Sequence, residues 1–173
     1  MNLPSDFKVL YTKKKIEERV CALANSISGD YEGKSPLLLG VLNGSFVFIA
    51  DLIRHLRVNA QTEFIRVSSY GNTTKSSGDV CITLDLPSSI AERDVIVIED
   101  IVDTGQTLNR LLGCLRDAEV ASLKVCVLLD KQVKRTIPIE VDYLGFTVPD
   151  RFIVGYGLDY KGLYRGLSQL YIM

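Results

Sequence analysis

The chain has 173 residues, 47% of them hydrophobic, and its 20 basic and 21 acidic side chains give a net charge of −1. One domain of this length can bury a sizeable core, so the composition excludes an intrinsically disordered chain. No basic excess indicates nucleic-acid binding, and no apolar run is long enough to predict a membrane-spanning helix.

The cysteines and the single histidine indicate the cellular setting. His55 is the only histidine of the sequence. The four cysteines are Cys21, Cys81, Cys114 and Cys126, and no two of them have the spacing of metal ligands. A structural zinc site is therefore not expected. The first residues show no charged segment followed by an apolar stretch, so no secretory signal is predicted. We expect a cytoplasmic protein with reduced thiols.

The first half of the chain alternates helical and strand patterns. A helix is predicted over residues 16–27, where apolar residues recur at helical spacing after Thr12 as an N-cap and before Gly29 as a stop. Apolar runs and alternating patterns instead indicate strands. The other elements expected before residue 90 are a helix at 47–56 and strands at 37–41, 62–68 and 82–86, with a long polar loop at 69–79.

The second half contains a strand, a helix and a strand in sequence. Residues 95–98 are wholly apolar, apolar residues at helical spacing follow over 108–115, and residues 125–129 form the next apolar run. This order predicts a βαβ unit with a parallel sheet that is buried on both faces. We therefore expect one α/β domain over residues 1–173, with a central parallel twisted sheet flanked by helices.

Two adjacent carboxylates, Glu99 and Asp100, follow the strand at 95–98. Ligands of open α/β sheets bind at the carboxyl ends of strands. Because ionised carboxylates are acceptors only, this pair suits the vicinal hydroxyls of a ribose or a hydrated Mg²⁺.

The turn after the acidic pair predicts a phosphate-binding loop. It offers successive backbone N–H groups and two hydroxyls at the start of a helix, from Thr104, Gly105, Gln106 and Thr107. A helix N-terminus favours an anion, and the glycine permits close approach. An acidic strand end or an N-capped turn is common without any ligand, but the whole run is hard to obtain by chance.

This run resembles the diphosphosugar-binding motif of the type I phosphoribosyltransferases. The segment Leu42-Asn43-Gly44-Ser45 resembles that family's pyrophosphate loop, and Ser69-Tyr70 with the polar stretch after it resembles its catalytic lid. Residues 148–160 resemble the purine-binding segment of the branch that uses hypoxanthine and guanine. The resemblance implies a purine salvage enzyme that transfers phosphoribosyl from 5-phosphoribosyl-1-pyrophosphate to a 6-oxopurine.

The resemblance also implies roles for residues that contact the base. Asp103 would exchange a proton with purine N7, and Lys131 would donate to the 6-oxo group. Phe152 would stack on the purine face, while the backbone of Ile153 would bind the base edge. Sequence alone permits an ordinary core aromatic at Phe152 equally well.

A second set of implied residues concerns pyrophosphate and its metal. Asp159, with Glu99 and Asp100, would hold Mg²⁺, and Arg165 would meet the charge of pyrophosphate. Some relatives carry lysine where this chain has Asn43, so that cation is missing here. The family's cis peptide would fall between Leu42 and Asn43.

The resemblance finally implies a small hood formed by the N-terminal segment and roughly residues 140–173, and a homodimer or homotetramer. Two alternatives remain open at this stage. One is a regulator with the same fold that binds nucleic acid, which the balanced charge and the purine segment disfavour. The other is an enzyme that prefers xanthine.

Overall fold

The computed structural model describes residues 4–67 and 90–173. The expected loop at 69–79, the strand at 82–86 and the site residues Ser69 and Tyr70 lie outside the described residues. In chain order the elements are β1 (Lys8–Tyr11), α1 (Lys13–Asp30), β2 (Leu37–Leu42), α2 (Phe46–His55), β3 (Gln61–Arg66), β4 (Asp94–Val102), α3 (Gln106–Asp117), β5 (Ser122–Asp130), the 3₁₀ turn η1 (Gln132–Lys134), β6 (Tyr143–Thr147), β7 (Ile153–Val154) and β8 (Leu170–Ile172).

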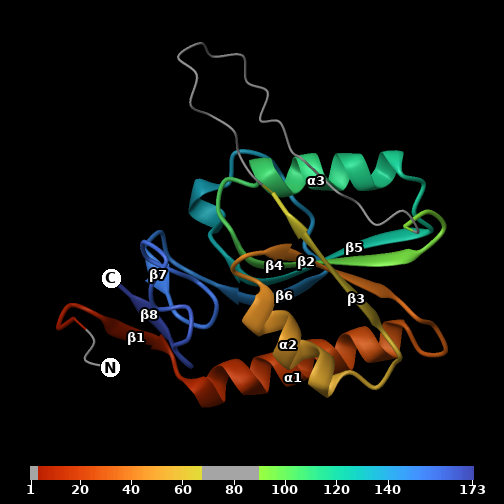
Figure 1. The fold of residues 1–173 in the computed structure, drawn as a ribbon. Coiled ribbons are helices and arrows are strands. Elements are labelled where there is room, and N and C mark those ends of the chain that lie inside the picture. Colours follow the sequence, from red (N-terminus) through yellow and green to blue (C-terminus); the bar gives the residue numbers. More distant parts are fainter. Residues whose placement is uncertain (1–3, 68–89) are drawn as a thin grey trace, which may run out of the picture.

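The main sheet has five parallel strands in the order β3-β2-β4-β5-β6. Helices α1 and α2 cover one face, and α3 covers the other (Figure 1). The predicted α/β class, with a parallel sheet flanked by helices, is confirmed. No helix within residues 4–67 and 90–173 is long and apolar enough to cross a membrane.

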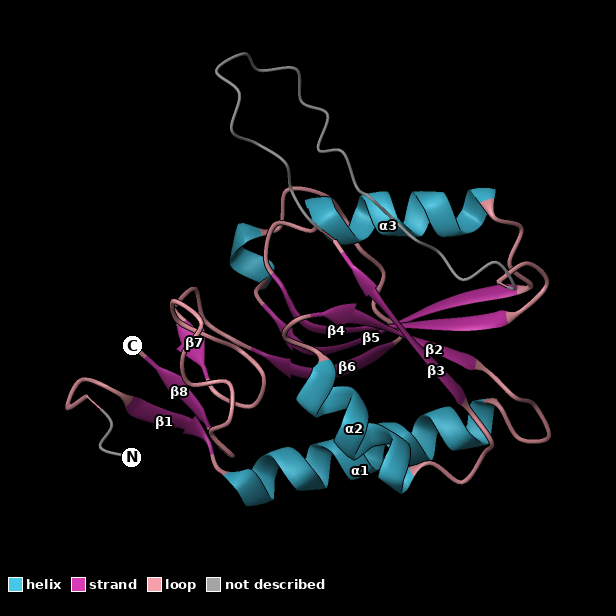
Figure 2. Cartoon of the chain, viewed as in Figure 1, coloured by secondary structure: helices cyan, strands magenta, loops and turns pink. Residues whose placement is uncertain are grey.

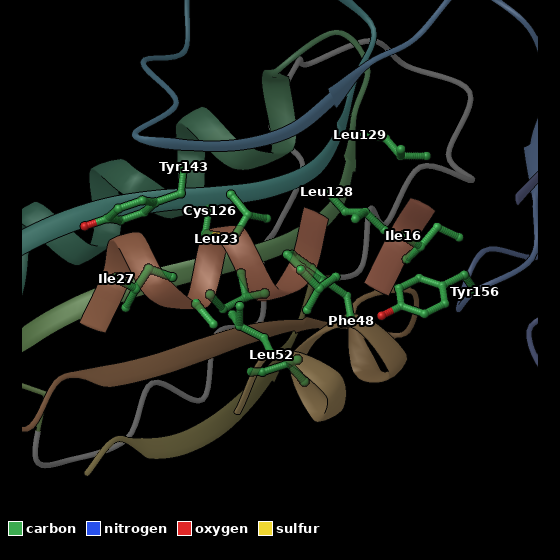
Figure 3. Packing of buried hydrophobic residues seen from close by; sticks show 14 of the residues in the cluster. Ile16, Leu23, Ile27, Phe48, Leu52, Cys126, Leu128, Leu129, Tyr143 and Tyr156 are labelled. Atoms are coloured by element: carbon green, nitrogen blue, oxygen red, sulfur yellow. The ribbon is translucent and has the colours of Figure 1, made fainter. Parts of the chain in front are cut away.

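Alternate residues of β4 enter two separate cores. Ile96 and Ile98 pack with α1 and α2, whereas Val95 and Val97 pack with α3. Successive side chains of a strand point to opposite faces, so a strand covered on both sides must be apolar at every position. Figure 3 shows the first of these cores, to which α1 contributes Leu23 and α2 contributes Phe48.

The helix boundaries differ slightly from the sequence expectation. Thr12 caps α1, since its hydroxyl accepts a hydrogen bond from Lys15 N at 3.3 Å. Gly29 does not stop this helix, which continues to Asp30. A glycine costs a helix about 1 kcal/mol, and the packing of Ile27 in the core offsets such a cost. The predicted strand at 62–68 is β3, which ends earlier, at Arg66.

The terminal segments form a second, three-stranded sheet. Antiparallel pairing joins β1 from the N-terminal end to β8, and β8 to β7. This small sheet lies beside the carboxyl ends of the main strands, as Figure 2 shows. It corresponds to the hood that the resemblance implied.

Candidate active site

The acidic pair lies inside β4 rather than after its end, because β4 continues to Val102. Pairing with β2 stops at Ile98, while pairing with β5 continues through Glu99 to Val102. From β2 the chain continues to β3 at one edge of the sheet, and from β4 it continues to β5 and β6 toward the other edge. The topological switch point of the sheet therefore lies between β2 and β4. Ligands of open α/β sheets bind at such a point.

Burial changes the acidity of both carboxyls. It raises the pKa of Glu99 well above its ordinary value, and the neighbouring charge of Asp100 raises it further. Burial also raises the pKa of Asp100, although a hydrogen bond from Ile101 N and the positive charge of Arg165 oppose this rise. Both shifts oppose the form in which the two carboxyls are ionised together.

The turn after β4 has the shape of an anion cradle. Gly105 has φ +85°, in the left-handed region that favours glycine, and α3 begins at the next residue. A Cβ on Gly105 would lie 2.9 Å from Ile137 O, so the chain behind the turn also requires glycine. A cavity of about 140 Å³ is lined by Glu99, Asp103, Gly105 and their neighbours. A larger cavity of about 500 Å³ lies beside α1 and α2, away from Asp103.

Asp103 and Lys131 are brought together at the mouth of this turn. The Lys131 side chain is 9% exposed, and its Nζ lies 3.9 Å from Asp103 Oδ2. The other carboxylate oxygen, Oδ1, is buried and accepts no hydrogen bond from any described residue, although the side chain as a whole is 43% exposed. Buried polar atoms nearly always have partners. The free oxygen therefore suits a ligand atom.

The loop after β2 carries a cis peptide bond between Leu42 and Asn43, as the resemblance implied. A Cβ on Gly44 would lie 1.5 Å from Asp100 Oδ2, so only glycine fits. On the other side, a Cβ on Gly157 would lie 2.1 Å from Gly44 O. The loop is thus held between the acidic pair and the hood.

A cation stands close to Asn43. Arg66 Nη2 donates to Asn43 Oδ1 at 3.4 Å, since Leu42 and Arg66 are paired across β2 and β3. Arg66 was not among the residues predicted from the sequence. A signal was available, because Arg66 lies near the end of the strand predicted at 62–68, and the carboxyl ends of parallel strands meet at one edge of the sheet.

Asp159 and Arg165 lie together in the hood. Arg165 Nη2 is 2.5 Å from Asp159 Oδ1, and Arg165 Nη1 donates to Gly157 O at 2.7 Å. The second oxygen of Asp159 accepts from Gly162 N at 2.7 Å. Arg165 is therefore anchored near the loop at Asn43 and Gly44 rather than free in solvent.

Phe152 is not a core aromatic, since it is 49% exposed. The Tyr160 ring meets it edge to face, with centroids 5.5 Å apart. Ile153 is buried in β7 directly after it. One face of an aromatic ring is thus available for stacking next to a fixed backbone edge.

Comparison with known proteins agrees with this geometry. The family model for the phosphoribosyl transferase domain matches residues 7–161. Hypoxanthine-guanine phosphoribosyltransferase from Bacillus subtilis is 43% identical over 96% of this chain and 92% of that protein. The chain belongs to the phosphoribosyltransferase family.

Two further similarities refine the family placement. A crystal structure of a hypoxanthine-guanine phosphoribosyltransferase from Bacillus anthracis, with a HEPES molecule in the active site, has a TM-score of 0.89 and 41% identity, covering 96% of this chain and 98% of that one. The bifunctional protein TilS/HprT of Listeria innocua is 43% identical over 96% of this chain, which spans only 26% of that protein's length.

The phosphoribosyltransferase site contains residues that sequence reasoning missed. Besides Arg66, these are Asp130 and Arg135, which form a buried ion pair behind Asp103. Arg135 follows the turn η1, where no period in the sequence shows which way its side chain points. Nothing in a pattern of residue types signals such a contact.

Proposed function

We propose that the chain transfers the 5-phosphoribosyl group of 5-phosphoribosyl-1-pyrophosphate to N9 of a 6-oxopurine, hypoxanthine or guanine, and releases pyrophosphate. The names of its relatives support this substrate class. The observation that carries the proposal is the pair formed by Lys131 and Asp103, with its buried, unpaired oxygen.

The pair matches one edge of the base. N7 and O6 of a 6-oxopurine are neighbouring acceptors on the same edge. Lys131, which has only donors, would bind O6, while Asp103 would give a proton to or take one from N7. Phe152 would stack on the purine face, and the backbone at Ile153 would bind its far edge.

The sugar and its phosphate would occupy the end of β4. Glu99 and Asp100 suit the ribose hydroxyls, because ionised carboxylates accept hydrogen bonds and a carboxyl whose pKa is raised can also donate one when protonated. The 5-phosphate would lie on the backbone N–H groups at the start of α3, in the turn formed by Thr104, Gly105, Gln106 and Thr107.

Pyrophosphate would lie between the loop at Asn43 and Gly44 and the side chain of Arg165. The described residues contain no group of three or more His, Cys, Asp or Glu side chains placed to hold a metal ion by themselves. Carboxylates of Asp159, Glu99 and Asp100 would therefore hold Mg²⁺ only together with substrate phosphates, as proteins usually do with one or two carboxylates. When bound, Mg²⁺ would neutralise charge that develops on the departing pyrophosphate.

Ser69 and Tyr70 remain part of the proposal as lid residues. The family's transition state resembles an oxocarbenium ion, which water would capture, so an active site of this kind gains from closing over its substrates. We also retain the single domain over residues 1–173 and a cytoplasmic location as parts of the proposal.

We further propose a homodimer or homotetramer. Large apolar side chains on α2 and β3 are exposed in the single chain, namely Phe46, Ile53 and Phe64 at 42%, 42% and 44%. A second copy would bury them. Analytical ultracentrifugation of the parent and of an Ile53→Asp variant tests this: we expect an oligomer that the substitution weakens, and a monomeric parent would refute it.

Turnover with a panel of bases tests the function. With 5-phosphoribosyl-1-pyrophosphate and Mg²⁺, we expect hypoxanthine and guanine to give nucleotides and adenine to be a very poor substrate. No feature of the described residues favours the two alternatives, a nucleic-acid-binding regulator or an enzyme that prefers xanthine. A gel shift with RNA or DNA, or a clear preference for xanthine, would reinstate one of them.

A further inference from the structure

Three consecutive carbonyl groups of the catalytic turn are held by one segment of the chain, residues 131–137. Val102 O accepts from Lys131 N at 3.0 Å. Asp103 O accepts from Arg135 Nε at 3.4 Å. Thr104 O accepts from the backbone N–H groups of residues 136 and 137, at 3.1 and 3.2 Å, and from the Thr136 hydroxyl at 3.1 Å.

Arg135 supplies the only side-chain contact to the carbonyl of Asp103 among these bonds. Its guanidinium also forms an ion pair with Asp130, and the two side chains are 14% and 6% exposed. The second oxygen of Asp130 accepts from Gln132 Nε2 at 3.2 Å. Arg135 Cδ lies 3.1 Å from the position of a Cβ on Gly105, so its stem also packs behind the turn.

Stability alone is a poor explanation for this pair. Removing two charges from water is costly, and replacing a buried ion pair by apolar side chains of similar volume is often neutral or stabilising. A guanidinium has its donors in a fixed fork. This fork pairs with Asp130, the last residue of β5, and bonds to the backbone of Asp103, the first residue after β4. It therefore connects the two strand ends that Lys131 and Asp103 follow.

We propose that Arg135 is a positioning residue for Asp103, held in its orientation by Asp130. The inference rests on the proposed function, in which Asp103 and Lys131 contact neighbouring atoms of one purine. Among the described contacts, Arg135 bonds to the backbone carbonyl of Asp103 and forms its ion pair with Asp130 rather than with the Asp103 carboxylate. It sets the backbone from which that carboxylate projects, and a displacement of about 1 Å can lower a rate by up to about a hundredfold.

Two variants separate positioning from simple charge neutralisation. Arg135→Met keeps an unbranched stem but removes the fork and leaves the Asp130 charge buried. The double variant Asp130→Asn/Arg135→Met removes both charges, so its thermal stability is expected to return toward that of the parent. Lys124→Met, which removes an exposed ion pair with Asp142 at the other end of β5, is the matched control.

Steady-state kinetics give the first readout. For both Arg135 variants we expect kcat/KM for hypoxanthine to fall about tenfold or more, with the KM for 5-phosphoribosyl-1-pyrophosphate changed less than about twofold, because Thr104 O keeps its three donors. Lys124→Met should match the parent. If the double variant recovers full kcat/KM, or if both substrates are affected equally, the positioning role is refuted.

The second readout does not require turnover. The backbone amide signals of Asp103 and Thr104, followed by NMR in ¹⁵N-labelled protein, should shift in both Arg135 variants and stay in place in Lys124→Met. Unchanged signals from both amides in the Arg135 variants would refute the inference. If the parent uses no purine while these signals still move, the proposed function fails and the positioning role stands.

Discussion

The Lys131 ammonium lies 3.9 Å from the Asp103 carboxylate, although the two residues follow different strands. Pairing of Val102 with Asp130 places the ends of β4 and β5 side by side, and the bond from Lys131 N to Val102 O fixes the next residue. A donor-only cation and a carboxylate therefore lie next to each other at the ends of β4 and β5. Their separation allows both to contact a single purine edge.

Replacing the carboxylate should affect proton transfer and little else. Asp103→Asn should lower kcat by about 10²–10⁴-fold, the range typical of general acid–base catalysis. Affinity for 5-phosphoribosyl-1-pyrophosphate should stay within about twofold, because the phosphate turn and the acidic pair are intact. Rapid-quench kinetics and calorimetric titration measure the two quantities.

The control for this change is Asp117→Asn, an exposed carboxylate at the end of α3. It removes the same charge and should leave turnover unaltered. An Asp103→Asn enzyme with parental turnover at several pH values would remove Asp103 from the mechanism.

Arg66 is expected to supply the cation that Asn43 lacks. Arg66→Ala should raise the KM for 5-phosphoribosyl-1-pyrophosphate about two- to fivefold, the effect of an exposed charge contact of up to ~1 kcal/mol. Adding Asn43→Lys to this variant should recover most of the loss. Because the contact is exposed, its effect should shrink at high salt. Arg54→Ala, on exposed α2 surface, is the control, and equal KM values in all variants would contradict the role.

The main sheet could be predicted because its strands are long and covered on both faces. The apolar runs at β2, β4 and β5 are the pattern typical of strands that are buried on both faces of a parallel sheet. The small sheet was not visible as strands, since β7 has two residues and β8 three. A period of two cannot be recognised over so few positions.

The candidate site could be predicted where its residues are consecutive in the sequence. Glu99, Asp100 and the turn after Asp103 form one continuous run, so residue type and order were sufficient. Contacts that depend on the direction of a side chain outside a regular element were not predictable. The ion pair of Asp130 with Arg135 depends on how the turn η1 directs a side chain, which only the packed structure determines.

The acidic pair makes the ligand-free protein less stable as pH rises. Burial raises the pKa of Glu99 above its ordinary value of 4.5, so the folded state keeps a proton that the unfolded chain has lost. The stability that protonated Glu99 contributes is complete below pH 4.5, and it is lost as the pH rises through the raised pKa of the folded state. Glu99→Gln, whose amide can donate to Asp100 as the protonated carboxyl does, should therefore be more stable than the parent at neutral pH.

Thermal unfolding between pH 4 and 8 measures this effect. The gain from Glu99→Gln should be near zero at the acidic end and should grow with pH, while affinity for 5-phosphoribosyl-1-pyrophosphate falls. Binding sites are often less stable than they could be, because the residues that bind the ligand are not the most stable choice in the ligand-free protein. Glu63→Gln, on the exposed side of β3, changes the charge equally and should show no such trend. A gain independent of pH would contradict a retained proton on Glu99.

Base selection should depend on Lys131. Its three donors match O6 of hypoxanthine or guanine, whereas adenine presents an amino group there and turns donor toward donor. A hydrogen bond to a charged group contributes ~1.5–3 kcal/mol, about tenfold to a hundredfold in affinity. Because Lys131 is 8% exposed, adenine would leave a buried ammonium unpaired, and its rejection should exceed that factor.

Lys131→Ala should therefore lower kcat/KM for hypoxanthine and guanine by about tenfold to a hundredfold and should narrow the gap to adenine. The KM for 5-phosphoribosyl-1-pyrophosphate should change little, because in the proposed binding mode Lys131 contacts the base and not the diphosphosugar. Lys134→Ala, which removes an exposed lysine paired with Asp150, is the matched control and should leave the order of bases unchanged. If Lys131 served only to end β5, Lys131→Ala would change the kinetic constants for neither the base nor 5-phosphoribosyl-1-pyrophosphate. Efficient use of adenine by the parent enzyme would overturn both this role for Lys131 and the 6-oxopurine assignment.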